Sequence, residues 1–437
     1  MPTTFEPVTD KVNFPTQERE ILQYWRDIDA FKQSVRQSQA EGRPAYIFYD
    51  GPPFATGLPH YGHILAGTIK DVVTRYAHMK GYHVERRFGW DCHGLPIEYE
   101  IDKKLSLKGR PDVLKMGIDK YNEECRSIVT RYTNEWRQIV ERFGRWVDFD
   151  NDYKTMDVTF MESTWWVFKE LFDKGLVYRA FRVMPFSTAC GTALSNFEVS
   201  QNYKEVSDPS IIVQFKVTLE EKRSILAWTT TPWTLPSNVA LCVNSKLKYL
   251  IVKNKENGHE WIVGKDRWPW VLSCLKKAAK DFEVLKEMEG KDLVGTSYEP
   301  LFEYFRGKVV KGKAWHIVSD GYVSTEAGTC IVHQAPAFGE DDNRVCLAAG
   351  IIRKDGTGMI CPVDDTGCFS EDVTDFKGQN VKDADKHIKE KLKKQGSLVY
   401  NGTEVHNYPH CWRSDTPLIY KAVASWFVKV EERREQL

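Results

Sequence analysis

The sequence has no long hydrophobic run, and nowhere do apolar residues approach the roughly 18 in succession that a membrane-spanning helix needs. Its charge is balanced, with 61 basic and 61 acidic residues among 437, which excludes nucleic-acid binding by bulk charge but not by a local basic groove. Ten cysteines are too dilute for a disulfide scaffold, so we expect reduced thiols. The N-terminus lacks the features of a signal or transit peptide, which favours a cytoplasmic, non-membrane protein.

What is present is typical of an ordinary globular protein. Hydrophobic residues make up 42% of the chain and charged residues 28%, which argues against a disordered or fibrous chain. The length favours about three domains. Aromatic residues reach 13%, with 14 tryptophans, and large cores are the commoner reason for such a content.

The segment from about residue 45 to 91 reads as a βαβ unit. Residues 45–49 are apolar and predict a short buried strand, and residues 50–59 are rich in turn formers. Gly81 supplies a helix stop, and residues 82–88 predict a second strand, parallel to the first with a right-handed crossover. Between them, apolar residues at helical spacing predict a helix: Leu65, Ile69, Val72, Val73 and Tyr76.

The chain then changes character. A long amphipathic helix over about 118–143, a helix over 157–173 and a strand over 176–183 complete an α/β region. Beyond residue 186 the sequence instead shows short strand-like runs, at 210–217, 224–228, 249–252, 316–318 and 329–333. We therefore expect a first α/β region over 1–185, a β-rich insertion over 186–405 and a return to the first domain over 406–437, with a strand at 425–430 and a charged helix from 431.

A phosphate-binding pattern lies where the loop meets the first predicted helix. His60, Gly62 and His63 occupy the helix N-terminus, whose free N–H groups and partial positive charge suit a phosphate. Gly62 lets a nucleotide approach the backbone, and the two histidines can stabilise charge developing on an α-phosphate without a covalent bond. Two surface histidines on an ordinary loop are the alternative, but the strand before and the helix after favour a phosphate site.

Asp91 follows the second predicted strand. Ligands of open α/β sheets bind beyond the carboxyl ends of the strands, so Asp91 is placed to meet a cationic group of a substrate. A simple cap of the next turn explains the residue equally well.

Two stretches resemble isoleucyl-tRNA synthetases of the eukaryotic cytoplasmic type, along essentially the whole chain. The first is Asp-Gly-Pro-Pro-Phe-Ala-Thr-Gly-Leu-Pro-His-Tyr-Gly-His over 50–63, which ends in the class I signature, and the second is Gly-Trp-Asp-Cys-His-Gly-Leu-Pro-Ile-Glu over 89–98. The resemblance implies a class I Rossmann fold (first half) interrupted by a β-rich editing domain. It also implies an isoleucine pocket in which Asp91 holds the α-ammonium while Pro52 and Trp426 pack the side chain.

The resemblance gives meaning to a threonine run that would otherwise read as β-propensity and turn chemistry. It implies that 227–238 and 328–342 face each other in a hydrolytic editing pocket, with these residues: Thr229, Thr230, Thr231, Asn238, His333 and Asp342. Asp342, rather than Asp341 by its spacing from Pro336, would anchor the α-ammonium of valyl-tRNA. Thr231 would help to position water, and His333 would exclude isoleucine.

A second site is needed because a pocket that accepts isoleucine cannot strongly reject valine. The two differ by one methylene, which contributes only about 1–3 kcal/mol in an apolar pocket, and enzymes of this kind are the standard example of that magnitude. The chain departs from the family inside the second editing segment. Cys330 stands where the family usually has glycine, so a side chain is expected to narrow the pocket there.

A further departure concerns zinc. Bacterial relatives have a Cys-x-x-Cys pair at each end of the insertion, whereas this chain has Ser187 with Cys190 and Cys411 with Ser414. Serine is a poor ligand for tetrahedral zinc, so we expect no structural zinc.

The resemblance implies an isoleucine–tRNA ligase that uses ATP, with Mg²⁺, isoleucine and tRNA(Ile), and that hydrolyses Val-tRNA(Ile). For a eukaryotic form, membership of a multi-synthetase complex is compatible, though no residue indicates it. No Lys-Met-Ser-Lys-Ser segment occurs, which predicts a fragment, a truncated isoform or an incomplete gene model. The alternatives are a truncated chain that retains only editing hydrolysis or tRNA binding, and a small-molecule nucleotidylyltransferase, which the threonine run argues against.

Overall fold

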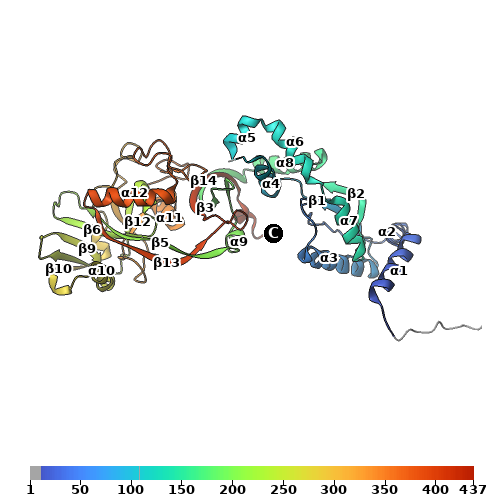
Figure 1. Cartoon of the computed structure of the whole chain (residues 1–437), viewed down its shortest axis with the longest axis horizontal. Coiled ribbons are helices and arrows are strands. Elements are labelled where there is room, and N and C mark those ends of the chain that lie inside the picture. The colour runs from blue at the N-terminus through green and yellow to red at the C-terminus, as the bar shows by residue number, and fades with distance from the viewer. Residues whose placement is uncertain (1–10, 108) are drawn as a thin grey trace, which may run out of the picture. The chain divides into compact units, whose positions relative to one another are not determined.

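The computed structural model describes residues 11–107 and 109–437. The chain divides into two compact units, the first ending at Glu170 and the second running Leu171–Leu437. Figure 1 shows the predominantly helical first unit and the sheet-rich second unit. This mixed α/β architecture agrees with the predicted fold class, whereas the predicted boundaries at residues 185 and 405 stay predictions. Among the described helices, none is long and apolar enough to cross a membrane.

The first unit is built from helices around a short parallel strand pair. Strands β1 (Arg87–Trp90) and β2 (Asp148–Lys154) form this pair. The helices are α1 (Phe14–Asp27), α2 (Ala30–Ala40), α3 (Tyr61–Met79), α4 (Leu95–Leu105), α5 (Arg110–Met116), α6 (Ile118–Val129), α7 (Thr133–Arg142) and α8 (Val158–Asp173). The helix predicted over 157–173 is confirmed as α8.

The predicted βαβ unit is only partly formed. The prediction of a buried strand over 45–49 is wrong. That segment makes a single parallel bridge, Ala45 to His83, and its Ile47 side chain is exposed. A second parallel bridge joins Phe54 to Asp91. The parallel direction was therefore predicted correctly, but no ladder forms along 45–49.

Helix α3 forms where predicted, but the apolar residues whose spacing predicts it do not form its buried face. All five are exposed: Leu65, Ile69, Val72, Val73 and Tyr76. The buried face instead consists of Gly67, Thr74 and Ala77. A Cβ added at Gly67 would lie 2.8 Å from the Phe143 ring, so small side chains let this face approach its neighbours closely.

The long helix predicted over 118–143 is two helices. The break occurs because the Tyr132 N–H leaves the helical ladder and donates to the Ala55 carbonyl oxygen at 3.2 Å. Trp136 and Val140 of α7 are buried as predicted, and they pack in one core with Phe88 and Trp90. This packing ties the helices to the strand that leads into Asp91.

The second unit contains three sheets. The six-stranded sheet has the order β10-β8-β9-β6-β5-β13, and the two smaller sheets have the orders β11-β7-β12 and β14-β3-β4. Their strands are β3 (Val177–Ser187), β4 (Thr192–Ala193), β5 (Tyr203–Lys216), β6 (Arg223–Thr229), β7 (Ala240–Val243), β8 (Lys248–Asn254), β9 (Glu260–Gly264), β10 (Phe282–Glu289), β11 (His316–Ser319), β12 (Val332–Gln334), β13 (Leu398–Pro409) and β14 (Ile419–Val428).

Helices are shorter and fewer in this unit. The α-helices are α9 (Asn196–Val199), α10 (Trp268–Leu275), α11 (Glu340–Ala348) and α12 (Val381–Lys394). Short 3-10 helices are η1 (Pro232–Ser237), η2 (Lys265–Arg267), η3 (Ala279–Asp281), η4 (Gly290–Leu293) and η5 (Val430–Arg433). The charged helix expected from residue 431 is thus only a 3-10 turn.

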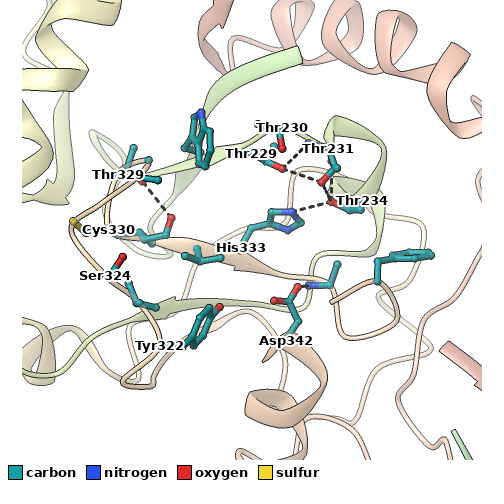
Figure 2. A pocket seen from close by; sticks show the side chains of 18 residues that line it. Thr229, Thr230, Thr231, Thr234, Tyr322, Ser324, Thr329, Cys330, His333 and Asp342 are labelled. Atoms are coloured by element: carbon teal, nitrogen blue, oxygen red, sulfur yellow. Dashed lines mark hydrogen bonds between the residues drawn. The ribbon is translucent and has the colours of Figure 1, made fainter. Parts of the chain in front are cut away.

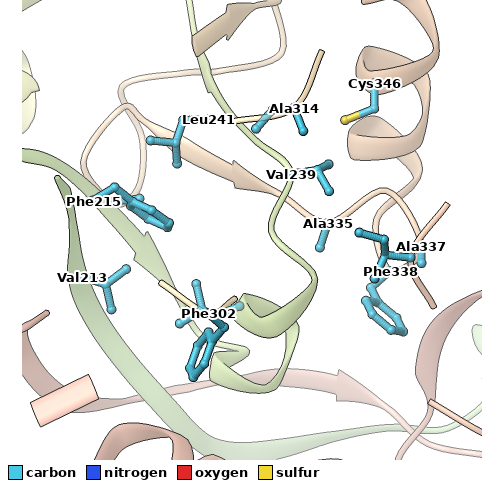
Figure 3. Packing of buried hydrophobic residues seen from close by; sticks show 14 of the residues in the cluster. Val213, Phe215, Val239, Leu241, Phe302, Ala314, Ala335, Ala337, Phe338 and Cys346 are labelled. Atoms are coloured by element: carbon cyan, nitrogen blue, oxygen red, sulfur yellow. The ribbon is translucent and has the colours of Figure 1, made fainter. Parts of the chain in front are cut away.

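Two strands far apart in the sequence form a long antiparallel ribbon. Strand β5 pairs with β13 from Tyr203 opposite Pro409 to Val213 opposite Leu398. The largest hydrophobic core lies between the sheets (Figure 3) and includes Phe215 of β5 and Leu241 of β7. Ala335 and Phe338, which follow β12, are buried in the same core, so it holds the segment that leads from β12 into α11.

Candidate functional site

A cavity of about 310 Å³ opens in the second unit between the two segments that the resemblance pairs. The end of β6 and the start of η1 form one wall, and the chain from Tyr322 through β12 to the first turn of α11 forms the other (Figure 2). Five predicted editing residues line it: Thr229, Thr230, Thr231, His333 and Asp342.

The threonine wall is a hydrogen-bonded network. The Thr229 hydroxyl oxygen accepts from the Thr231 N–H at 3.0 Å and lies 3.2 Å from the Thr231 hydroxyl. The Thr231 hydroxyl lies 3.3 Å from that of Thr234, which donates to the Thr231 carbonyl oxygen at 2.8 Å. The run is therefore a preorganised polar surface.

The network also determines the tautomer of His333. Its Nε2 lies 2.9 Å from the Thr234 hydroxyl oxygen. The Thr234 proton is directed to the Thr231 carbonyl, which can only accept, so His333 Nε2 must donate. Nδ1 is then an acceptor, and it has no partner among the described residues. Burial lowers the pKa of His333 to about 4, so the ring is neutral at physiological pH.

Asp342 supplies the negative group of the cavity. It lies in the first turn of α11, and its Oδ2 accepts from the Ala335 N–H at 2.8 Å. Gly339 makes room for it, because a Cβ there would lie 2.8 Å from the Asp342 Cγ. Burial, with a smaller contribution from Asp341, raises the pKa of Asp342 to about 6. The group is a carboxylate at pH 7 that a bound cation would stabilise.

Asn238, also predicted from the resemblance, does not line the cavity. Its amide Nδ2 donates to the Ala240 carbonyl oxygen at 2.9 Å, and its Oδ1 accepts from the Tyr298 hydroxyl at 2.7 Å. Both contacts fix the chain between η1 and β7. The geometry is that of a structural residue which holds the threonine wall in place.

Sequence reasoning missed three residues that line the cavity, Thr234, Tyr322 and Ser324. Only Thr234 could have been found, since it belongs to the threonine-containing stretch over 227–238. Asp385 of α12 lies outside the cavity and accepts from the Trp233 N–H at 2.9 Å, which anchors η1.

Cys330, the departure from the family pattern, adopts a left-handed backbone conformation with φ of 58°. This explains why glycine is usual there, since a Cβ is disfavoured at positive φ. A Cβ added at Gly264 would lie 2.6 Å from the Cys330 sulfur. The side chain thus occupies space that Gly264 leaves open, and Figure 2 shows the sulfur at the edge of the cavity rather than beside His333.

In the first unit, the two histidines of the phosphate-binding pattern form a reciprocal cap at the start of α3. His60 Nδ1 accepts from the Gly62 N–H at 3.1 Å, and His63 Nδ1 accepts from the His60 N–H at 3.2 Å. The rings are stacked with centroids 3.7 Å apart. Because both Nδ1 atoms accept, the neutral rings carry their protons on Nε2 and can donate them to a ligand.

The predicted isoleucine-binding residues lie in different units. The Asp91 N–H donates to the Pro53 carbonyl oxygen at 2.9 Å, which brings the loop containing Pro52 beside the end of β1. Asp91 is half-buried, in accord with a ligand-binding carboxylate or a cap. Trp426 lies on β14 in the second unit, where it pairs with Arg179 of β3 and is exposed.

Asp50, at the start of the same loop, is a fully buried anion between two cations. Its Oδ1 accepts from Lys70 Nζ of α3 at 2.5 Å, and its Oδ2 accepts from Arg145 at 2.8 Å. The Tyr153 hydroxyl donates to its carbonyl oxygen at 2.8 Å. Asp50 therefore connects the loop to α3, to the end of α7 and to β2.

The residues at the two positions where the resemblance implies Cys-x-x-Cys pairs lie close together. The Cys190 and Cys411 sulfurs are 3.9 Å apart, Ser187 accepts from the Cys190 N–H, and the Ser414 N–H donates to the Cys411 sulfur at 3.5 Å. Hydrogen bonding from the Cys190 thiol holds the pKa of Cys411 below its usual range. No group of three or more His, Cys, Asp or Glu side chains among the described residues is arranged around a metal position. The expected absence of zinc stays a prediction.

We expect the double substitution Ser187→Cys with Ser414→Cys to create a zinc site. Four thiolates at zinc–sulfur distances of about 2.3 Å have sulfurs about 3.8 Å apart, close to the spacing that Cys190 and Cys411 already have. Metal analysis after dialysis should give about one zinc per variant chain and none for the unaltered chain or for a Ser187→Ala, Ser414→Ala control. One zinc per unaltered chain would contradict the prediction.

Comparisons with known proteins agree with the family resemblance of residues 50–63 and 89–98. The family model of the tRNA synthetases class I (I, L, M and V) matches residues 20–437. The chain is 58% identical over 432 residues to the mouse protein named isoleucine–tRNA ligase, cytoplasmic, and 56% identical over 455 residues to the Arabidopsis thaliana protein of the same name. It is 53% identical over 435 residues to the isoleucine–tRNA ligase of Bdellovibrio bacteriovorus.

These matches cover 97–100% of this chain but only 34–40% of the length of those relatives. Among solved structures, one described as "The crystal structure of GlLeuRS-CP1" matches 44% of the chain at 12% identity, with a TM-score of 0.34, too low to support a conclusion. The family model covers nearly the whole chain, so the chain belongs to the class I tRNA synthetases (I, L, M and V).

Proposed function

We propose that the protein containing this chain is an isoleucine–tRNA ligase. It joins L-isoleucine to tRNA(Ile) with ATP, releasing AMP and pyrophosphate, and it hydrolyses valyl-tRNA(Ile) formed in error. The observation that carries the proposal is identity of 53–58%, over essentially this whole chain, to relatives of that name. The cytoplasmic names of two of them support a cytoplasmic location.

In the synthetic reaction, His60 and His63 donate hydrogen bonds from Nε2 to the phosphate oxygens of ATP, which enters with Mg²⁺. As isoleucine attacks the α-phosphorus, these donors stabilise the charge that develops on the phosphate oxygens. Gly62 supports this role, because a Cβ there would lie 3.0 Å from the His60 ring and would displace it. Asp91 binds the α-ammonium of isoleucine, and Pro52, on the loop beside it, contacts the side chain. The same role for Trp426, which belongs to the second unit, rests on the resemblance alone.

In the editing reaction, Asp342 binds the α-ammonium of the mischarged valine. Its carboxylate sits in a partly desolvated cavity, where attraction to a cation is stronger than in water. The threonine network, with Thr231 at its centre, orients water toward the ester carbonyl. His333 is neutral and held by Thr234, so it limits the space for a larger side chain without adding charge.

The test is the hydrolysis of Val-tRNA(Ile) by the purified 437-residue chain, with Ile-tRNA(Ile) as the second substrate. We expect selective loss of valine, because the larger side chain is excluded from a cavity of about 310 Å³ that also holds the ribose end. Hydrolysis of both substrates at equal rates, or of neither, would contradict the editing assignment.

The synthetic assignment is tested separately, by isoleucine-dependent exchange of pyrophosphate into ATP with the complete protein. Replacing His63 by asparagine should lower the exchange rate by about 10²-fold, the usual cost of one charge-stabilising donor. His387→Asn, on the exposed side of α12, is the matched control. Exchange that is unchanged in His63→Asn would contradict the role of this histidine.

A further inference from the structure

Tyr322 lines the same cavity from the segment between β11 and β12 and has no part in the proposed mechanism so far. Its backbone N–H donates to Asp320 at 3.0 Å. Asp320 in turn accepts from both terminal nitrogens of Arg344, at 2.7 and 2.9 Å, and Arg344 belongs to α11, the helix that carries Asp342. The tyrosine is thus held in a fixed position relative to the carboxylate.

The direction of its hydroxyl proton follows from Gln334. This glutamine is fully buried, and its Nε2 donates to the Tyr322 hydroxyl oxygen at 2.6 Å and to the Val332 carbonyl oxygen at 3.2 Å. A carbonyl can only accept, so Val332 fixes which end of the amide is the nitrogen. The Tyr322 oxygen must therefore accept from Gln334, and its own proton remains available.

No described residue accepts that proton. The hydroxyl reaches the cavity that Asp342 shares (Figure 2), and burial, then the Asp342 charge, raise the pKa of Tyr322 above its usual value. The phenol therefore keeps its proton at neutral pH. The cavity thus holds an oriented hydrogen-bond donor beside the group that binds the ammonium.

We propose that the Tyr322 hydroxyl donates to the carbonyl oxygen of the aminoacyl ester and stabilises the negative charge on it during hydrolysis. This role rests on the proposed editing function. In an aminoacyl ester, a single atom, the α-carbon, separates the ammonium nitrogen from the carbonyl carbon. An ammonium held by Asp342 therefore keeps the carbonyl within reach of a neighbouring donor.

The chemistry is an ester hydrolysis. Water adds its oxygen to the carbonyl carbon, and the carbonyl electron pair moves onto its oxygen, where the Tyr322 proton meets it. The pair then re-forms the carbonyl, the ester carbon–oxygen bond breaks, and the ribose oxygen leaves with the proton lost by water. The products are valine and tRNA with a free ribose hydroxyl, and Tyr322 keeps its proton throughout.

Gln334 is the positioning residue for this donor. Replacing it with glutamate retains a hydrogen bond to Tyr322 but reverses it at a pH high enough to ionise the buried carboxyl, because a carboxylate can only accept. The tyrosine proton would then point away from the cavity. Gln334→Glu should consequently resemble Tyr322→Phe, although the tyrosine is still present.

The experiment measures steady-state hydrolysis of Val-tRNA(Ile) by the 437-residue chain, by Tyr322→Phe and by Gln334→Glu. Tyr322→Phe should lower kcat by about 10²-fold and leave KM within about twofold, since the hydrogen bond strengthens only as charge develops. Tyr304→Phe, whose hydroxyl contacts Asp375 outside the cavity, should match the unaltered chain. Circular dichroism of each variant serves as the check that it is folded.

The outcomes separate the two proposals. An active unaltered chain with an equally active Tyr322→Phe would overturn the role of Tyr322 and leave the editing function standing. A rise in KM of about 10²-fold in Tyr322→Phe, with kcat unchanged, would also overturn the role of Tyr322. Such a result would indicate that the hydroxyl contributes only to binding of the ground state. If the unaltered chain does not hydrolyse Val-tRNA(Ile), the editing function and the role of Tyr322 fall together. Should Gln334→Glu unfold, Gln334→Met gives the second test, with a smaller loss of kcat.

Discussion

Replacing Asp342 with asparagine is expected to lower hydrolysis of Val-tRNA(Ile) by at least about 10²-fold and to raise the thermal stability of the second unit. The loss follows because the α-ammonium would enter a partly desolvated cavity without its counter-ion, at a cost of about 3 kcal/mol. Asparagine has nearly the same shape and can still accept from the Ala335 N–H, so the fold should be retained.

The stability gain follows from the raised pKa. In the folded chain the Asp342 pKa is about 6, above its ordinary value of 3.8, so the folded state binds this proton more tightly than the unfolded state. The stability that this adds is complete below about pH 4 and is lost as the pH rises through 6. At pH 7 the buried charge destabilises the fold, and asparagine removes that cost, which is about 1–2 kcal/mol after allowance for solvent screening.

The pH dependence provides an independent check. Hydrolysis by the unaltered chain should rise as the pH increases through about 6, because only the carboxylate binds the ammonium. Calorimetry and deacylation at pH 5 to 8 measure both properties. Asp383→Asn, on the first turn of α12, is the matched control. Loss of activity together with a lower melting temperature would contradict this account, since it would indicate a damaged fold.

Replacing Asp50 with alanine is expected to destabilise the first unit by about 3–5 kcal/mol. The substitution leaves Arg145 buried and unpaired, and it removes the partner of Lys70. Breaking a buried ion pair by deleting one member has this large cost because the remaining charge is neither solvated nor paired.

Asp150→Ala is the appropriate comparison. Asp150 also pairs with two cations, Lys32 and Arg137, but all three side chains are about half exposed. Exposed pairs contribute about 1 kcal/mol or less, so this variant should stay close to the unaltered chain. Denaturant unfolding followed by tryptophan fluorescence measures both, and equal midpoints for Asp50→Ala and Asp150→Ala would refute the prediction.

The helices of the first unit show what a pattern in the sequence can and cannot predict. Apolar spacing located α3 correctly, because any amphipathic period of this kind favours a helix. The same spacing does not indicate which face is buried, since Gly67 and Ala77 carry too little apolar surface to stand out against residues such as Leu65 and Ile69. Close approach to Phe143 depends on the absence of side-chain atoms, which hydrophobic patterns do not register.

The cavity shows a different limit. Thr231, His333 and Asp342 could be paired because they lie in stretches with a recognisable family pattern, and the structure brings them together. The contact between Tyr322 and Gln334 could not be predicted, since Tyr322 lies outside both stretches and no pattern in the sequence pairs it with a glutamine twelve residues later. Their relation exists only through the register of β12 and the turn before it.

The β5–β13 ribbon has a consequence for how the second unit can be divided. Tyr203 and Pro409 are paired neighbours, so the chain enters and leaves the ribbon at almost the same point in space. Paired residues of antiparallel strands have Cα atoms about 5 Å apart, a gap that a short turn can close. The 205 residues between them can therefore be replaced by a two-residue Asn-Gly joint at the ends of the two strands. Such an excision would also uncover Val183 and Phe186 of β3 and Ile419 and Ala422 of β14, which are buried in the core of the excised segment. The segment is thus a single insertion in its connectivity, but its packing includes the two strands that flank it.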